Sequence, residues 1–355
     1  MEQANLPQSL QSSLNETKVS YVRLGRSGLR ISVPSLGGMS FGHKDWQPWV
    51  LDDEVAVDKL LKAAYDQGLN TFDTANAYSN GLSETMIGNF IKTNNIPRSK
   101  VIILSKCFSP VGEEPGVLNY LYPDTMAKSK DYVNQGGLSR AAIFNAVEAS
   151  LRRLGTTYLD LLQVHRFDKA VPIEETMKAL HDLVERGKVR YIGASSMWAY
   201  QFSMMQHVAE LHGWTKFISM QNHHSLCYRE EEREMNPFCL ESGVGLMAWS
   251  PLYGGLLARP LSYPATKRQE AAKTQPTPED GEIIDAVQEI AERKGWTMTQ
   301  VALVWLVQKN STPIVGISSL ERLSEAINIR GKKLTLEETS ALEKAYKPKV
   351  IIGLA

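Results

Sequence analysis

The chain has 355 residues, of which 43% are hydrophobic and 22% are charged, and its 39 Lys and Arg residues balance 39 Asp and Glu residues. This ordinary globular balance excludes a strongly basic surface for nucleic acid. No apolar run is long enough to span a membrane, residues 1–20 lack the apolar core of a signal peptide, and the three cysteines lack metal-ligand spacing. We therefore expect a cytoplasmic protein with reduced thiols, no metal and no membrane or nucleic-acid partner.

The N-terminal part of the chain divides into a polar tail and a hairpin. Residues 1–20 are rich in Gln, Ser and Asn, which predicts a disordered tail and leaves residues 21–355 as a single domain. Within residues 21–33, two β-like runs flank a turn at Gly25–Gly28. This pattern indicates a hairpin, which could close the bottom of a barrel.

Eight short apolar runs follow, and each is continuous rather than alternating, as in parallel strands buried on both faces. Helical patterns separate the runs; for example, Ser139 can cap an amphipathic stretch that ends at Gly155. This alternation favours a (β/α)₈ TIM barrel, with a doubly wound open sheet as the second possibility. The predicted strands are 34–39, 70–74, 101–106, 159–165, 189–195, 217–221, 244–250 and 312–317.

Two connections are much longer than the others. Residues 107–138 follow the third predicted strand, and residues 251–280 follow the seventh. Long connections at the C-terminal face of a barrel usually carry function. The second connection contains Gly254 and Gly255 and a polar stretch with few apolar anchors, so we predict a clamp that is mobile when empty and ordered over a bound ligand. The alternative is a permanently packed surface loop.

Four side chains with acid–base chemistry lie at or near the ends of the second, third and fourth strands: Asp73, Tyr78, Lys106 and His165. Taken singly, each could be a cap, an ion-pair partner or a solvated group. The ends of adjacent barrel strands meet at one face, however, so the four side chains are expected to converge. A lysine cation makes a nearby tyrosine a better acid, an aspartate balances the lysine charge, and a neutral histidine orients an oxygen. The set predicts protonation of a carbonyl oxygen by Tyr78.

Three segments that contain these side chains resemble the motifs of the aldo-keto reductases. They are residues 70–88, 104–106 and 160–166, and the similarity extends from about Tyr21 to Ile329. The resemblance implies an NADP-dependent enzyme of EC class 1.1.1 that reduces an aldehyde or ketone to an alcohol, with the four side chains as its catalytic tetrad.

The resemblance also implies a site for NADPH or NADP⁺. In that site Ser195, Ser196 and Gln221 hold the nicotinamide amide, and Trp249 stacks on its ring. The 2′-phosphate lies where the last helix begins, because helix N-termini and arginine suit phosphate. Ala326 stands where the family often has Asn, which leaves the adenine contact to Glu325. The implied cofactor-binding residues are Gly38, Met39, Asp73, Ser195, Ser196, Gln221, Trp249, Ser250, Pro251, Leu252, Gly255, Gly316, Ser318, Arg322 and Glu325.

Aromatic side chains in the connections indicate an apolar or aromatic substrate, although ordinary loop packing would also explain them. Within the family, the chain most resembles the fungal versiconal hemiacetal acetate reductases and aryl-alcohol dehydrogenases, which favours a role in secondary metabolism. One alternative is a nicotinamide-sensing regulatory subunit like the potassium-channel β subunits. Another is an unrelated barrel enzyme such as a phosphate-handling lyase, which leaves the four side chains unexplained. The predicted substrate pocket comprises Trp46, Trp49, Tyr78, His165 and Trp198.

Three other patterns are weaker. Residues 243–248 fit a dinucleotide-binding glycine motif but begin a strand instead of joining a strand to a helix. His223 and His224 are neighbours that point to opposite faces of a strand, which argues against a shared metal. Cys107 follows Lys106 but has no nearby residue that would activate its thiol.

Overall fold

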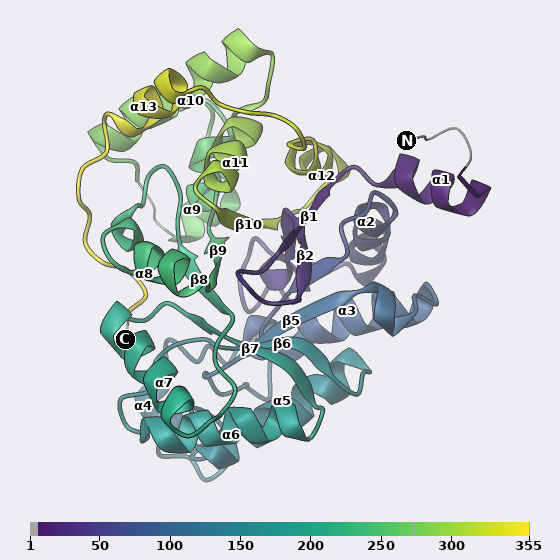
Figure 1. The fold of residues 1–355 in the computed structure, drawn as a ribbon, viewed down its shortest axis with the longest axis vertical. Coiled ribbons are helices and arrows are strands. Elements are labelled where there is room, and N and C mark those ends of the chain that lie inside the picture. The colour runs from purple at the N-terminus through teal and green to yellow at the C-terminus, as the bar shows by residue number, and fades with distance from the viewer. Residues whose placement is uncertain (1–5, 273–274, 355) are drawn as a thin grey trace.

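Eight parallel strands close into a barrel in the order β10-β3-β4-β5-β6-β7-β8-β9, with the helices arranged around them (Figure 1). The structure is a computed structural model that describes residues 6–272 and 275–354. It confirms the predicted (β/α)₈ barrel. The first strand is shorter than predicted, because Gly38–Ser40 form a 3₁₀ turn. The strands are β3 Ser35–Gly37, β4 Thr71–Asp73, β5 Ile102–Cys107, β6 Leu159–Val164, β7 Val189–Ser195, β8 Ser219–His223, β9 Gly245–Trp249 and β10 Ser311–Gly316.

The surrounding helices pack apolar side chains against the barrel, and α11 is buried on nearly every side. In α5, Ser139 Oγ accepts the N–H of Ala142, and Gly155 ends the helix with φ 61°. The apolar positions of this helix, among them Ile143 and Val147, are buried as their spacing predicts. The principal helices are α2 Glu54–Asp66, α3 Leu82–Thr93, α5 Arg140–Leu154, α6 Ile173–Glu185, α7 Ala199–Leu211, α8 Met235–Ser242, α10 Pro278–Lys294, α11 Met298–Gln308, α12 Leu320–Ile327 and α13 Leu336–Glu343.

The predicted hairpin consists of β1 (Ser20–Arg23) and β2 (Arg30–Val33), which pair in antiparallel fashion. Its turn is held to the barrel by the Arg26 N–H, which donates to the Gly243 carbonyl at 2.8 Å. Side chains of the hairpin pack with residues from inside the barrel and close its N-terminal end. This cluster contains Leu24, Leu29, Ile31, Leu104, Leu161, Met247 and Ile314.

Part of the predicted disordered tail is helical. Residues Gln8–Glu16 form α1, which begins after Pro7 and buries none of its side chains. The chain after the helix is held beside α2, where the Lys18 N–H donates to the Gln67 carbonyl at 2.9 Å. Figure 1 shows α1 standing off the barrel on the side of α2. The tail prediction is therefore wrong for residues 8–16, while residues 1–5 lie outside the described part of the chain.

Both long connections contain short ordered pieces. The connection after β5 includes α4 (Pro123–Met126) and is held by Asn80, whose Nδ2 donates to the Glu114 and Val117 carbonyls. The connection after β9 contains the 3₁₀ turn Tyr253–Ala258 and helix α9 (Lys267–Ala272). The predicted clamp includes residues 273–274, which lie outside the described residues. No helix in the described ranges is long and apolar enough to cross a membrane.

Candidate active site

Lys106 joins two of the predicted catalytic side chains at the C-terminal mouth of the barrel. Its ammonium group contacts the Asp73 carboxylate and lies 3.3 Å from the Tyr78 hydroxyl oxygen. It also donates to the Thr74 carbonyl at 2.9 Å. Lys106 is 1% exposed and Asp73 is 2% exposed, so the ion pair is shielded from solvent. The paired charges can therefore act on Tyr78 without screening by bulk water.

Burial and neighbouring charges determine the protonation states of Lys106 and His165. Burial alone would lower the pKa of Lys106, but the Asp73 carboxylate, with help from Tyr78, raises it. Burial lowers the pKa of His165 well below its ordinary value, and the positive charges of Lys106 and Arg166 lower it further. At neutral pH the lysine is therefore a cation and the histidine is uncharged.

Two glutamines hold Asp73 from its other side. Gln163 Nε2 and Gln221 Nε2 donate to Asp73 Oδ2 at 3.0 and 2.9 Å, and Gln221 also donates to Gln163 Oε1 at 2.8 Å. These bonds fix the carboxylate that faces Lys106. Sequence reasoning missed Gln163, although a signal existed: it lies two residues before His165 and therefore shares its face of β6.

Tyr78 and His165 meet beside a long cavity. Their ring centroids are 5.8 Å apart and the rings are nearly perpendicular, at 79°. The Trp46 ring packs against the Tyr78 ring as well, with ring centroids 6.3 Å apart. The cavity has a volume of about 1080 Å³, and its wall includes these three side chains with Trp49 and Trp249. The structure thus places Asp73, Tyr78 and His165 on the cavity wall, with Lys106 directly behind them.

Trp249 is the last residue of β9 and lines one end of the cavity. Its Nε1–H donates to Ser196 Oγ at 2.9 Å, and its indole stacks on His223 with centroids 4.1 Å apart. Ser195 Oγ donates to the Gln221 carbonyl at 2.9 Å. The predicted nicotinamide-binding residues are therefore neighbours in space, and their mutual hydrogen bonds fix the orientation of the indole.

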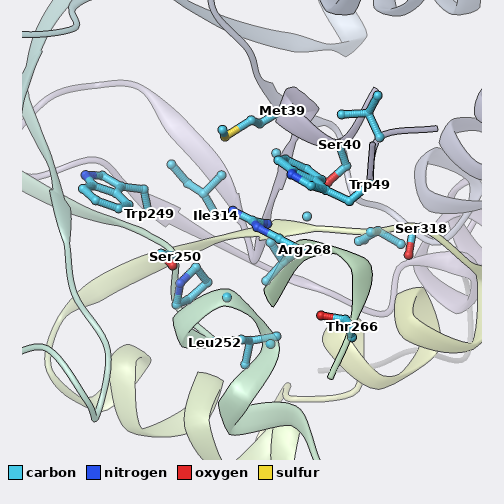
Figure 2. Close-up of a pocket in the computed structure, with 18 of the residues that line it drawn as sticks. Met39, Ser40, Trp49, Trp249, Ser250, Leu252, Thr266, Arg268, Ile314 and Ser318 are labelled. Carbon is cyan, nitrogen blue, oxygen red and sulfur yellow. The ribbon is translucent and has the colours of Figure 1, made fainter. Parts of the chain in front are cut away.

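The opposite end of the cavity lies at α12 and the connection after β9. Trp249 and Ser318 stand at opposite ends of the cavity in Figure 2, with Arg268 between them under Trp49. Arg322 Nη1 donates to Ser318 Oγ at 2.6 Å, and the Arg268 guanidinium lies 4.5 Å from the Trp49 ring. All the other predicted cofactor residues from this end also line the wall: Ser250, Pro251, Leu252, Gly255, Gly316 and Glu325.

The backbone after β9 turns repeatedly through left-handed conformations. Ser250 has φ 54° and Tyr253 has φ 49°, followed by Gly254 at 67° and Gly255 at 94°. Pro251 has no N–H, and the N–H groups of Tyr253 and Gly255 donate to the Ser250 and Leu252 carbonyls within the turn, so the N–H groups of Leu252 and Gly254 are the ones that can bind an anion. The two glycines adopt these angles without the strain that a side chain would add.

Three arginines around this turn and α12 lack a carboxylate partner within residues 6–272 and 275–354: Arg259, Arg268 and Arg322. Burial, together with the nearby charge of Arg322, lowers the pKa of Arg259. Burial also lowers the pKa of Arg268. Sequence reasoning missed Arg259 and Arg268, because they lie in a polar connection with no periodic pattern. This unbalanced positive charge suits a phosphorylated ligand.

The structure corrects one predicted pocket residue and refines others. Trp198 does not line the cavity; it is 37% exposed at the beginning of α7, where its backbone N–H donates to Gln201 Oε1. Gly38 and Ser196 are also absent from the wall. Gly38 packs against β4 and accepts a hydrogen bond from Ser83, while Ser196 Oγ accepts the Trp249 Nε1–H. Met39, which the sequence also predicts to bind the cofactor, does line the cavity.

The two adjacent histidines and Cys107 lie in surroundings that make them unsuitable as metal ligands or nucleophiles. His223 stacks between Tyr228 and Trp249, whereas His224 Nε2 lies 2.9 Å from Glu232 Oε1, so the two rings have separate surroundings. Burial and the nearby charge of Glu84 raise the pKa of Cys107 to about 12. Its thiol is therefore protonated and poorly nucleophilic at neutral pH.

A closed barrel with this buried acid–base group at its C-terminal mouth defines a class of enzyme: the barrel oxidoreductases that act on small molecules. Residues 35–347 match the sequence model of the aldo/keto reductase family. An aldo-keto reductase of Fusarium vanettenii is 51% identical, and the alignment covers 98% of this chain and 96% of that protein. The versiconal hemiacetal acetate reductase of Aspergillus parasiticus is 47% identical over 93% of this chain and 98% of its own.

The chain belongs to the aldo/keto reductase family and is an oxidoreductase that acts on small carbonyl compounds. The aldo-keto reductase AFTS1 of Alternaria alternata is similarly related, with 50% identity over 98% of both chains. The resemblance drawn from the sequence motifs, including the one to versiconal hemiacetal acetate reductase, is confirmed.

Proposed function

We propose that this enzyme reduces an aldehyde or ketone to an alcohol with NADPH, and that Tyr78 donates the proton. The observation that carries the proposal is the position of Lys106 Nζ, which contacts the Asp73 carboxylate and lies 3.3 Å from the Tyr78 hydroxyl at the cavity wall. No other cation contacts that hydroxyl within the described residues. This arrangement is what a tyrosine needs in order to act as an acid near neutral pH.

The residues present fit NADPH. The turn at Ser250–Gly255 and Arg268 would hold the pyrophosphate, while Ser318, Arg322 and Arg259 would hold the 2′-phosphate at the beginning of α12. When bound, NADPH supplies the hydride for the carbonyl carbon. The support for this choice is the unpaired positive charge at one end of the cavity and the indole of Trp249 at the other.

The protein's own groups handle the proton. The Tyr78 O–H donates to the carbonyl oxygen, and the nearby Lys106 cation stabilises the phenolate that remains. Asp73, held by Gln163 and Gln221, keeps the lysine charged and in place. Neutral His165 donates a hydrogen bond to the same oxygen and orients it toward Tyr78.

The substrate side of the cavity favours an apolar or aromatic carbonyl compound. Trp46 and Trp49 pack edge to face there, with centroids 6.4 Å apart, and both line the cavity. Such walls bury a flat apolar body well. The Aspergillus relative takes its name from the reduction of an acetylated hemiacetal. We therefore place this enzyme in fungal secondary metabolism. Its three buried free cysteines, Cys107, Cys227 and Cys239, support a place in the reducing cytoplasm.

The test is NADPH oxidation followed at 340 nm with a panel of aldehydes and ketones. We expect turnover of several aromatic aldehydes, with NADPH preferred over NADH. A control reaction without carbonyl compound measures background oxidation. Tight NADPH binding without turnover of any panel member would contradict the proposal and would instead indicate a nicotinamide-sensing protein.

A further inference from the structure

The wall of the cavity carries a further cation on the substrate side, apart from the arginines proposed to bind the cofactor phosphates. Arg166 follows His165 directly and lines the same cavity. One of its nitrogens, Nη1, donates to the His165 carbonyl at 2.5 Å. A guanidinium has five N–H donors, so most of its hydrogen-bonding capacity is left for other partners.

The described carboxylates around Arg166 do not balance its charge, and its Nη2 lies beside the backbone of Gly353 in the C-terminal segment. Within residues 6–272 and 275–354 it forms no ion pair with a carboxylate. Asp168, two residues away, is used by the N–H groups of Leu138 and Ala170. Asp52, which also lines the cavity, pairs with Lys44 at 2.7 Å. Burial lowers the pKa of Arg166, which shows that its charge is poorly solvated.

The proposed cofactor leaves Arg166 available. The charges of NADPH are on its phosphates, and their proposed sites are the α12 end of the cavity, with Arg259 and Arg322, and its middle, where Arg268 lies (Figure 2). Arg166 belongs to the other end, beside His165, where the carbonyl group reacts. A guanidinium at that place therefore faces the substrate and not the phosphates.

We infer that Arg166 binds a carboxylate on the substrate, so that this enzyme prefers aromatic carbonyl compounds that carry an acid group. Arginine grips a carboxylate through two parallel N–H···O bonds, which also fixes the substrate's direction in the cavity. Trp46 supplies the flat apolar wall for the ring, and Tyr78 and His165 meet the carbonyl oxygen. This inference rests on the proposed function, because the group recognised belongs to the molecule being reduced.

The test compares 2-, 3- and 4-carboxybenzaldehyde with their methyl esters. The ester is the more electron-withdrawing group, so chemistry alone favours reduction of the ester. We expect wild-type kcat/KM to be at least 10-fold higher for the acid than for the ester in one or more of the three isomers, mainly through KM. In Arg166→Gln this ratio should fall to about 1, and Arg166→Lys should retain part of it. Lys169→Gln is the matched control, because it removes an exposed cation that lies near Arg166 in the sequence but not on the cavity wall, and its ratio should equal that of wild type.

A second measurement keeps the inference testable if turnover is low. Benzoate should inhibit wild type at least 10-fold more strongly than benzamide, and Arg166→Gln should lose this difference. NADPH titration of each variant shows whether it is folded. An acid-to-ester ratio near 1 for every isomer in wild type, or an undiminished ratio in Arg166→Gln, would overturn the inference. If wild type reduced neither acid nor ester, the proposed function would fail, while calorimetric titration of benzoate into wild type and Arg166→Gln would still report on Arg166.

Discussion

The Lys106–Asp73 pair at one end of the cavity and the arginines at the other end hold charge in opposite ways. At the barrel mouth, Lys106 and Asp73 are buried and paired with each other. At α12, Arg322 is exposed, and neither it nor Arg268 has a carboxylate partner among the residues that the structure describes. A buried pair is organised before any ligand arrives, whereas unpaired cations are completed by an anionic ligand. Changes at the first end should therefore act on folding and catalysis, and changes at the second on cofactor affinity.

The largest expected effect is at Lys106. Lys106→Met should lower kcat by about 10³-fold, because Tyr78 loses the charge that makes it a good acid. It should also destabilise the protein by about 3–5 kcal/mol, since the Asp73 carboxylate stays buried without its partner. Steady-state kinetics and urea unfolding measure the two effects.

The control is the double variant Asp73→Asn with Lys106→Met, which removes both charges. It should regain much of the lost stability without regaining activity. Normal turnover in either variant would show that the pair is not coupled to Tyr78.

At the other end, Arg322→Ala should weaken NADPH binding and leave NADH binding nearly unchanged. A charged hydrogen bond to the 2′-phosphate contributes about 1.5–3 kcal/mol, or roughly 10- to 100-fold in Kd. Fluorescence titration of both cofactors measures the ratio, with Arg330→Ala as a control on an exposed arginine beyond α12. Equal affinity of the wild-type protein for NADPH and NADH would contradict the assignment.

The connection after β9 should respond to the cofactor more than the catalytic end does. It supplies Arg259 and Arg268 to the cavity and carries few buried side chains. We expect hydrogen exchange across residues 254–272 to slow by about 10-fold on saturation with NADPH, while β4 and β5 change little. Unchanged exchange across residues 254–272 would rule out the clamp and support a permanently packed loop.

The last effect is on stability alone and concerns a buried neutral group behind Trp249. Burial lowers the pKa of His223 to about 3, with smaller contributions from His224 and Lys349. A lowered pKa means that the unfolded chain binds the proton first, so this stabilisation is complete above about pH 6.5 and is lost as pH falls toward 3. From pH 7 to pH 4, the free energy of unfolding should therefore decrease by about 3 kcal/mol less in His223→Phe than in wild type.

Urea unfolding at several pH values checks this, with the exposed His212→Gln as the control. Parallel pH profiles for His223→Phe and wild type would show that His223 is not held neutral by the fold.

The sequence predicted the barrel and the convergence of the acid–base group well, because both follow from local patterns. Continuous apolar runs mark buried parallel strands, and residues at strand ends must meet at one face. Trp198 lies three residues beyond the end of β7, directly before α7. Its orientation depends on the local backbone there, which no hydrophobic periodicity of the sequence predicts. Arg259 and Arg268 reach the cavity only through the path of an irregular connection. Helix α1 was missed because Leu10 and Leu14 are its only large apolar residues, both stay exposed, and the rest of the helix is polar.

The central claim is that Tyr78 transfers the proton that accompanies carbonyl reduction. Single-turnover stopped-flow measurement of NADPH oxidation tests it most directly, because cofactor release does not limit the observed rate. Tyr78→Phe should bind NADPH as wild type does but oxidise it at least about 10²-fold more slowly with a saturating aromatic aldehyde. Tyr200→Phe, at an exposed position on α7, should react at the wild-type rate. A Tyr78→Phe rate within a factor of two of wild type would contradict the claim.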